Sequence, residues 1–595
     1  MTKKNNFLML LSAVGLMGFT ACADDKYDLS DIDMTIGVGS DEGFALPSSS
    51  TKLIKLGDML ELDDSKNVII NENNDYVFVL DGGEVADVTT EINQIAIVDE
   101  EKKSIDYRVE IPIPDLPIGA VWEDKTISIP AGEIDKELYT LRYEGDKPAE
   151  VVDLKNVGTR GSFNVDIEFS KDVQRFIPSF LTFQIEFPSY MKVKVSNWNS
   201  YTGEEKDDHT LQIKNVPTTK PLKVGVNIEA LEFGEEGQDF LKINGETINM
   251  EGIVKVKVKW EAGEKTIHAG ETFEKLELIN HMKIEDCFIT SATGKFDPEI
   301  DIQELGNATI GDLPDFLTNE DVVLDLDNPQ ITINLNSDLP VPGFLWGELT
   351  TTDKNGNATT DANGYPIVLN TGKIAIHGEN NTIVICKKHE EPEDGVTNYV
   401  VRPTELSSII ENLSKIESFS FTAGARANPE VESKIDLSQT YTIKPSYKIE
   451  APLALGERAR IAYKDTLDGW NEDLQDLEFL DGAYLQVTAD IENKIPANLS
   501  IDAYTIGVNG ERVDDVTVEI DNTIIPAFTT TPFNISIKSK NALEKIDGIV
   551  FSFKVTAYVD EETHQVYTLN AENHGIKLEN IKVALKGKVV IKDED

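Results

Sequence analysis

The chain has 595 residues, of which 27% are charged, and its formal net charge is −51 at pH 7. A chain of this length holds about four domains, each large enough for its own hydrophobic core. The excess of acidic residues repels phosphate groups, so nucleic acid and anionic lipid headgroups are excluded as preferred partners. Three cysteines are too few for a disulfide-stabilised scaffold, so folding must rest on the cores.

The first 26 residues have the layout of an export signal. Lys3 and Lys4 form a basic start, residues 7–18 form an apolar run, and small residues precede Cys22. The apolar run is about a dozen residues long, whereas a membrane-spanning helix needs roughly 20. The sequence therefore predicts a signal peptide at 1–21, which is followed by a short tether at 22–28.

The residues around Cys22 carry a resemblance to a known class of proteins. Phe19-Thr20-Ala21-Cys22 resembles the lipobox of bacterial lipoproteins, with Phe19 where the family usually has Leu, and acidic residues follow the cysteine at once, as in Bacteroidota-type surface lipoproteins. The resemblance covers only this N-terminal stretch. It implies that Cys22 is acylated and anchors the protein at the outer membrane or cell surface. An ordinary secretory signal with an incidental cysteine is the alternative.

Beyond the tether, apolar and polar residues alternate with period two. Examples are residues 191–195, 253–259 and 331–335. This alternation, rich in β-branched residues, is typical of half-buried strands and predicts an all-β chain with antiparallel sheets. One helix is expected after Pro403, where Leu406, Ile409, Ile410 and Leu413 recur at helical spacing.

A boundary motif recurs along the chain, with apolar residues at offsets 0, 3, 5 and 7 and a nearby glycine. Its copies begin at Leu29, Val151, Ile284, Ile416 and Leu578, of which the second is the weakest. Five copies delimit four modules, at 29–150, 151–283, 284–415 and 416–595. Intervals of this length suit one whole β-sandwich each, so we expect tandem antiparallel (Ig-like) β-sandwich modules in an elongated chain.

Shorter fragments support the repeat. Residues 331–340 match residues 487–496, and residues 251–258 match residues 547–554. A strand pattern shared without common origin is the alternative, because such patterns are loose.

A polar loop offers one candidate metal site. Asp353, Asn355, Asn357 and Asp361 supply oxygen atoms at the spacing of a calcium loop, but Ala358 and Gly364 replace its turn glycine and its bidentate glutamate. Asn355-Gly356 is also a strong hairpin-turn signal, so a turn is favoured over calcium. No other cofactor is expected, because the seven histidines show no metal-ligand spacing.

Two cysteines remain once Cys22 is acylated. Cys287 occupies an apolar offset of the boundary motif and is expected to be a buried thiol. A disulfide between Cys287 and Cys386 stays open, since an exported protein meets oxidising conditions.

Aromatic side chains on polar loops are the candidate ligand contacts, because a flat ring stacks on a sugar face at little entropic cost. Trp198 and Tyr201 share one such loop, and Trp346 and Trp470 lie near comparable turns. Packing over the edge of a sandwich core is the alternative for each ring.

The sequence thus predicts an outer-membrane or cell-surface lipoprotein with a non-catalytic binding role. Besides the membrane that holds its anchor, its partner would be a glycan or an envelope protein. A structural stalk or adhesin subunit is one alternative, and it would show no exposed aromatic platform. A carboxylate-based glycoside hydrolase is another, and it would show a pocket lined by acids with perturbed pKa values.

Overall fold

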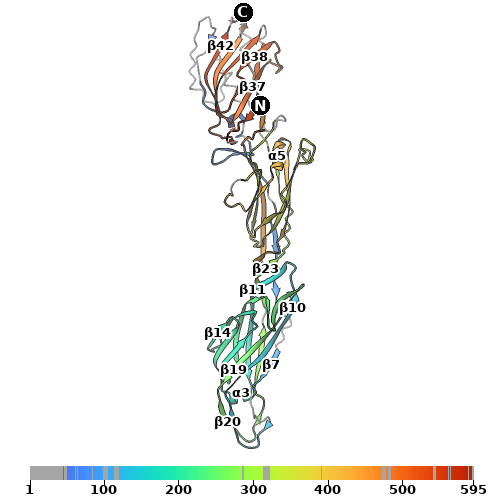
Figure 1. Cartoon of the computed structure of the whole chain (residues 1–595), viewed down its shortest axis with the longest axis vertical. Helices are drawn as coiled ribbons and strands as arrows, with labels where there is room; N and C mark the ends of the chain where they lie inside the picture. The colour runs from blue at the N-terminus through green and yellow to red at the C-terminus, as the bar shows by residue number, and fades with distance from the viewer. Residues whose placement is uncertain are drawn as a thin grey trace.

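The structure is a computed structural model. It describes residues 44–45, 50–60, 62, 65–83, 85–97, 105–112, 119–284, 287–311, 322–389, 392–471, 477–479, 484–539, 545–560, 562, 565–586 and 589–591. The molecule is a long all-β rod (Figure 1), as the alternating sequence pattern predicted. The expected helix is α5 (Pro403–Glu411). None of the helices in these ranges is long and apolar enough to cross a membrane.

Three two-sheet sandwiches follow one another along the rod, and we call them the distal, middle and proximal modules. In the distal module, one sheet has the order β14 (Gly203–Asp207), β15 (Thr210–Pro217), β12 (Ser179–Glu186), β19 (Thr247–Trp260), β18 (Asp239–Asn244) and β17 (Gly234–Glu236). The facing sheet has the order β13 (Met191–Asn197), β16 (Leu222–Glu232), β11 (Val151–Phe169), β22 (Glu277–Ile284) and β7 (Ile105–Glu110), and β23 (Phe288–Phe296) also pairs with β11.

The middle module has the same two layers. One sheet runs β3 (Val68–Ile70), β4 (Tyr76–Asp81), β33 (Thr440–Pro452), β25 (Gln330–Ser337), β29 (Asn381–Cys386) and β30 (Asn398–Val401). The other runs β24 (Glu304–Thr309), β31 (Ser418–Ala427), β26 (Gly343–Thr352) and β27 (Val368–Asn370), with β28 (Ile374–Ile376) also on β26. The short strands β6 (Ile95–Ala96) and β32 (Glu432–Asp436) pair with β23 and so connect this module to the distal one.

The proximal module contains the last long strand of the chain. One sheet runs β1 (Phe44–Ala45), β42 (Gly575–Lys586), β36 (Tyr484–Asn493), β40 (Thr530–Ser539) and β38 (Val516–Asp521), and β2 (Ile54–Lys55) also pairs with β42. The other runs β34 (Arg460–Leu467), β41 (Gly548–Ala557), β37 (Ala497–Ile506) and β39 (Ile524–Ile525). A separate ribbon pairs β35 (Leu477–Phe479) with β43 (Val589–Ile591).

The three modules share one strand topology. Six strands recur in the same chain order: β11, β12, β13, β15, β16 and β19 in the distal module, β24, β25, β26, β29, β31 and β33 in the middle one, and β34, β36, β37, β40, β41 and β42 in the proximal one. In every module the fifth strand pairs with the first and the third, and the second pairs with the fourth and the sixth. The internal repeat is therefore a repeat of topology.

The second and third strands of each module form a corner between the two sheets. Pro188, Pro340 and Pro496 lie in these corners, where a residue without an N–H removes no ladder hydrogen bond. In the proximal corner, the buried Asn493 accepts the N–H of Ile495 and donates to the carbonyl of Ala497. The strand therefore changes sheets without leaving its buried polar groups unpaired.

The described strands of residues 44–146, which we call the N-terminal segment, are distributed along the whole rod. β1 and β2 pair with β42, β4 and β5 (Val88–Glu91) pair with β33, and β10 (Gly132–Asp146) pairs with β19. The segment thus supplies a neighbouring strand to the sixth strand of every module. It reaches the proximal module first, then the middle one and then the distal one, whereas the six-strand repeats follow along the chain from distal to proximal. In Figure 1, β10 of this segment lies with β19 in the lower part of the rod, and blue parts of the segment are also seen farther up.

This arrangement corrects the predicted module boundaries. The described part of 29–150 is not one module, because its strands belong to all three sandwiches. The predicted boundary at 283/284 falls inside β22, and the described modules of shared topology number three rather than four. Alternation along a strand reveals which face is buried but not which strand lies beside it, and this explains the error.

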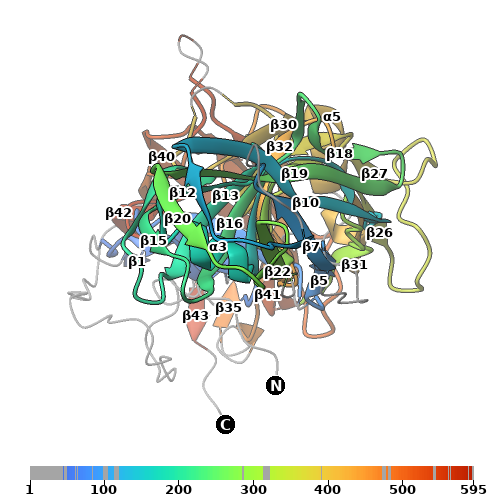
Figure 2. The same cartoon turned by 90° about the horizontal axis from the view of Figure 1, so that it is seen from below.

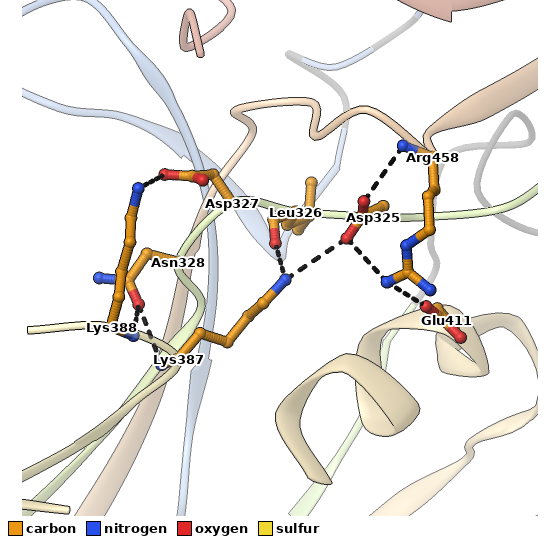
Figure 3. A network of polar contacts seen from close by, with 8 residues as sticks. All are labelled: Asp325, Leu326, Asp327, Asn328, Lys387, Lys388, Glu411 and Arg458. Carbon is orange, nitrogen blue, oxygen red and sulfur yellow. Dashed lines mark hydrogen bonds and ion pairs between the residues drawn. The ribbon is translucent and has the colours of Figure 1, made fainter. Parts of the chain in front are cut away.

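A polar network joins the middle and proximal modules (Figure 3). The Asp325 carboxylate, which is 10% exposed, accepts hydrogen bonds from Lys387 Nζ at 3.4 Å and from the backbone N–H of Arg458 at 3.2 Å. The Arg458 guanidinium also contacts Glu411 on α5 at 2.7 Å. Burial raises the pKa of Asp325, but the Arg458 N–H and the charges of Lys387 and Arg458 outweigh it and hold this pKa below its ordinary value.

Candidate functional site

The distal tip is the end of the rod farthest from β1 and β42. It consists of two ribbons, which pair β8 (Gly119–Ala120) with β21 (Thr272–Phe273) and β9 (Lys125–Ile129) with β20 (Gly263–Ile267). In Figure 1, β20 lies at the bottom and β42 at the top, with the modules between them. Figure 2 views the rod from this end, and β20 and α3 (Lys171–Phe176) lie toward the viewer.

Trp122 lies in the tip, between β8 and β9, and is 90% exposed. A tryptophan side chain is largely apolar and is usually buried, so an almost fully exposed one does not contribute to the core. Its neighbour Val121 is buried and anchors the same loop. The sequence reasoning missed Trp122, although its position before Glu123 and Asp124 in a polar loop was a usable signal.

Hydrogen bonds on both sides hold the Trp122 loop in place. The backbone N–H of Val121 donates to the carbonyl of Glu271, and that of Gly270 donates to the carbonyl of Val121. Asp124 accepts the N–H of Ala269 at 2.9 Å and contacts His268 Nδ1 at 3.0 Å. The exposed ring is therefore presented by an ordered loop, which reduces the entropy lost on binding.

Charge at the tip is shaped by the same contacts. The Ala269 N–H and then His268 lower the pKa of Asp124, and Arg175 followed by the His268 N–H lowers the pKa of Glu271. Both side chains are therefore carboxylates across the physiological pH range. Glu271 is ion-paired with Arg175, whereas Glu123 and Asp124 directly follow Trp122 in the same loop and supply negative charge there.

The predicted pair Trp198 and Tyr201 comes together in the turn between β13 and β14, but as packing residues. Both are half-buried against the core, and a Cβ added at Gly203 would lie 2.2 Å from the Trp198 ring. The Tyr201 hydroxyl donates to the carbonyl of Pro221, and Lys220 lies over its ring. Neither ring offers an open face comparable to that of Trp122.

Trp346 and Trp470 differ in exposure. Trp346, on β26, is 43% exposed, and its ring lies against Gly424 of the neighbouring β31. Trp470 is half-buried against the core, and its buried Nε1 has no hydrogen-bond partner among the described residues. Of the four predicted aromatic contacts, Trp346 presents the most open ring.

The predicted calcium loop forms two separate turns. Asp353 accepts the N–H groups of Asn355 and Asn357 at 2.8 and 2.9 Å, and Asp361 accepts those of Asn363 and Tyr365, both at 2.9 Å. These backbone donors lower the pKa of both carboxyls. Each carboxylate thus accepts the backbone N–H groups of its own turn. Over the described ranges, no three His, Cys, Asp or Glu side chains are placed to hold a metal ion.

Cys287 and Cys386 are both buried free thiols. Cys287 directly precedes β23, which pairs with β11 of the distal module, whereas Cys386 ends β29 in the middle module. Burial raises the pKa of Cys287 to about 12, so this thiol is unreactive at neutral pH. The disulfide left open by the sequence is not formed in the structure. Cys22 itself lies outside the described residues.

A cavity of about 50 Å³ lies in the proximal module, beside α2 (Leu56–Leu60). Its lining is apolar: Leu56, Met59, Leu60, Leu455, Ile461, Ile495, Ala497, Leu499, Phe553, Val555, Leu569 and Ile576. It contains no carboxylate that could act as the acid or base of a glycoside hydrolase. This cavity therefore gives the hydrolase alternative no support.

The comparisons with known proteins name no family for this chain. No family model matches it, and no curated protein matches it. A solved structure of a proposed secreted protein from Parabacteroides distasonis aligns over 50% of this chain and 90% of its own length, with 14% identity and a TM-score of 0.34. A structure of infectious bursal disease virus aligns over 79% and 87%, with 7% identity and a TM-score of 0.12. Scores this low carry no argument about function.

Proposed function

We propose that this chain is a lipid-anchored protein of the outer membrane or cell surface, with a non-catalytic role, that binds a partner protein through its distal tip. The observation that carries the proposal is the position of Trp122. This ring is 90% exposed and lies in the tip loop between β8 and β9. The tip is at the opposite end of the rod from β42, and β42 pairs with β1, the described strand nearest to Cys22 in the chain.

The length of the rod gives the tip its reach. The sixth strands β19, β33 and β42 contain 14, 13 and 12 residues, so each module is roughly 40 Å long and three in line extend about 120 Å. Pairing of β1 and β2 with β42 ties the first described strands of the chain to the proximal module. An anchor at Cys22 would therefore hold the proximal module near the membrane and leave the tip outermost.

The tip has the character of an interface centre. Tryptophan is enriched among the residues that dominate binding energy, and its removal from such a position costs about 2 kcal/mol or more. Glu123 and Asp124, which follow Trp122 in the chain, match a partner whose apolar pocket has a basic rim. A purely structural stalk gives no reason for an exposed tryptophan at this place.

Site-specific photo-crosslinking on intact cells tests the proposal. A photoreactive residue at Glu123 is expected to give a discrete adduct that Trp122→Ala removes. The matched position is Asn509, which lies in an exposed turn of the proximal module and should give no such adduct. If position 123 gives no more adduct than position 509, or if Trp122→Ala leaves the adduct unchanged, the tip is not the binding site.

A further inference from the structure

We propose that the outward face of the three-stranded patch β24-β31-β26 in the middle module binds a neutral carbohydrate chain. We call this surface the β26 face. It goes beyond the tip proposal, because it lies on another module and takes a ligand of another class. Trp346 is the exposed aromatic ring on it.

Strand register places the side chains of the β26 face in rows. The first three rows each contain a residue from β26, β31 and β24: Thr352, Ser418 and Thr309; Thr350, Ser420 and Asn307; Glu348, Thr422 and Glu304. Two further rows contain Trp346 opposite Gly424 and Phe344 opposite Arg426. The alternate residues, such as Leu345, Leu349 and Phe421, are buried in the core, so these rows point outward.

The dimensions of this face suit an extended chain. Rows two residues apart are separated by about 6.8 Å along a strand, so five rows extend roughly 27 Å, and three strands are roughly 10 Å wide. The rows form one continuous surface of the sheet. A ligand lying along the strands would cross the hydroxyl-rich rows first and the Trp346 row next.

The Trp346 ring is positioned for stacking. A Cβ added at Gly424 would lie 2.8 Å from three atoms of the indole ring, so the ring lies flat across this glycine. One ring face is therefore held against the backbone of β31, and the other contributes to the 43% exposure of the residue. A ring fixed in this way can stack on the apolar C–H face of a sugar without losing side-chain freedom.

Hydroxyl groups on the other rows can recognise the sugar rim. Thr352 Oγ1 and Ser418 Oγ lie 2.6 Å apart, and Thr350 and Thr422 donate to neighbouring carbonyls at 3.3 Å. A hydroxyl that donates once still accepts from two directions. The face therefore presents ordered acceptors for sugar hydroxyls beside an aromatic ring.

Charge decides which carbohydrate fits. Arg426 is paired with Asp297 at 3.0 Å, and Lys373 Nζ lies 3.6 Å from the centroid of the Phe344 ring. Glu348 and Glu304 are exposed on the face itself, and the whole chain has a net charge of −51. This surface repels sulfated or uronic acid polymers, and the same repulsion opposes docking of a second copy of the chain. A neutral carbohydrate is not repelled in this way.

Titration calorimetry of the full mature chain, made soluble by Cys22→Ser, tests the inference. The probes are neutral gluco-, manno-, galacto- and xylo-oligosaccharides of six or more residues, with a sulfated and a uronic acid polymer beside them. At least one neutral probe should bind, and Trp346→Ala should weaken it at least tenfold. Trp198→Ala removes another tryptophan that lies over a glycine and should leave the affinity within twofold.

A second variant separates binding from folding. Gly424→Ala retains the indole ring but forces it off the backbone, so it should also weaken binding severalfold while the thermal unfolding midpoint of the middle module changes little. Three results would overturn the inference: no neutral probe binds, Trp346→Ala and Gly424→Ala leave the affinity unchanged, or only the anionic polymers bind. Binding of a protein at this face in place of the sugars would also overturn it.

Discussion

Replacement of Phe78 by alanine tests whether the N-terminal segment is an integral part of the middle module. Phe78 lies on β4 and is 1% exposed, and it pairs in register with Ala451 of β33. Loss of a buried phenylalanine costs about 3 to 5 kcal/mol. This is a large share of the roughly 5 to 15 kcal/mol that stabilises a domain. Phe78→Ala should therefore destabilise the whole middle module, although the other long strands of that module begin more than 200 residues later in the chain.

Hydrogen exchange read by mass spectrometry is the assay for Phe78→Ala. Because about 1.4 kcal/mol corresponds to a factor of ten, amides of β33 and β25 should exchange roughly a hundred to several thousand times faster. Amides of the distal strands β12 and β19 should keep their protection. Ile69→Ala is the matched control, since Ile69 is 45% exposed on β3 and its loss should change stability by less than about 0.5 kcal/mol. Faster exchange confined to residues 68–91 would refute the reasoning.

Two further changes test the junction and the proximal module. Asp325→Asn should lower the stability of the middle and proximal modules by about 2 to 4 kcal/mol at pH 7, because it leaves Lys387 without its buried carboxylate partner. The folded-state pKa of Asp325 is lowered, so this contribution is present above the ordinary pKa of about 3.9 and is lost as the pH falls through the lower folded value. In a series of urea unfolding measurements from pH 7 downward, the difference between variant and wild type should shrink once the pH passes below the ordinary pKa. Truncation after Asn573 removes β42, whose Ile576, Leu578 and Ile581 are each 1% exposed. Calorimetry should then lose the proximal transition and keep the other two, whereas an unchanged set would show that β42 is dispensable.

Much of the local structure could be predicted from the sequence. The alternation at 253–259 lies in β19, where Val254, Val256 and Val258 are fully buried and the lysines between them point to solvent. The predicted strands at 191–195 and 331–335 are β13 and β25, and the helix after Pro403 is α5. In each case the spacing of apolar residues along the chain is enough to predict the element.

The repeat was recognised only in part, for a physical reason. The match of 331–340 with 487–496 is confirmed, because both segments contain the second strand of a module and its corner. The match of 251–258 with 547–554 joins β19, a sixth strand, to β41, a fifth strand. Strands with similar burial look alike in sequence whatever their neighbours, so the pattern could not separate topological positions.

The candidate sites show the same limit. The sequence proposed Trp346 and Trp198 as equivalent contacts, yet Trp346 is exposed whereas Trp198 is half-buried against the core. Its polar loop marked Trp122 as a candidate, but the exposure of that ring could not be read from the sequence, because it depends on two ribbons that bring residues 121 and 270 together from distant parts of the chain. Exposure is a property of the assembled tip.

Labelling of a cysteine placed at the tip tests most directly whether the rod displays its distal end outside the cell. Cys287 and Cys386 are only 3% and 1% exposed, so Trp122→Cys introduces the one accessible thiol of the described chain. Intact cells carrying Trp122→Cys should react with a membrane-impermeant maleimide, and Cys22→Ala in the same chain should release the labelled protein from the membrane fraction. Labelling that appears only after the cells are lysed would contradict this account.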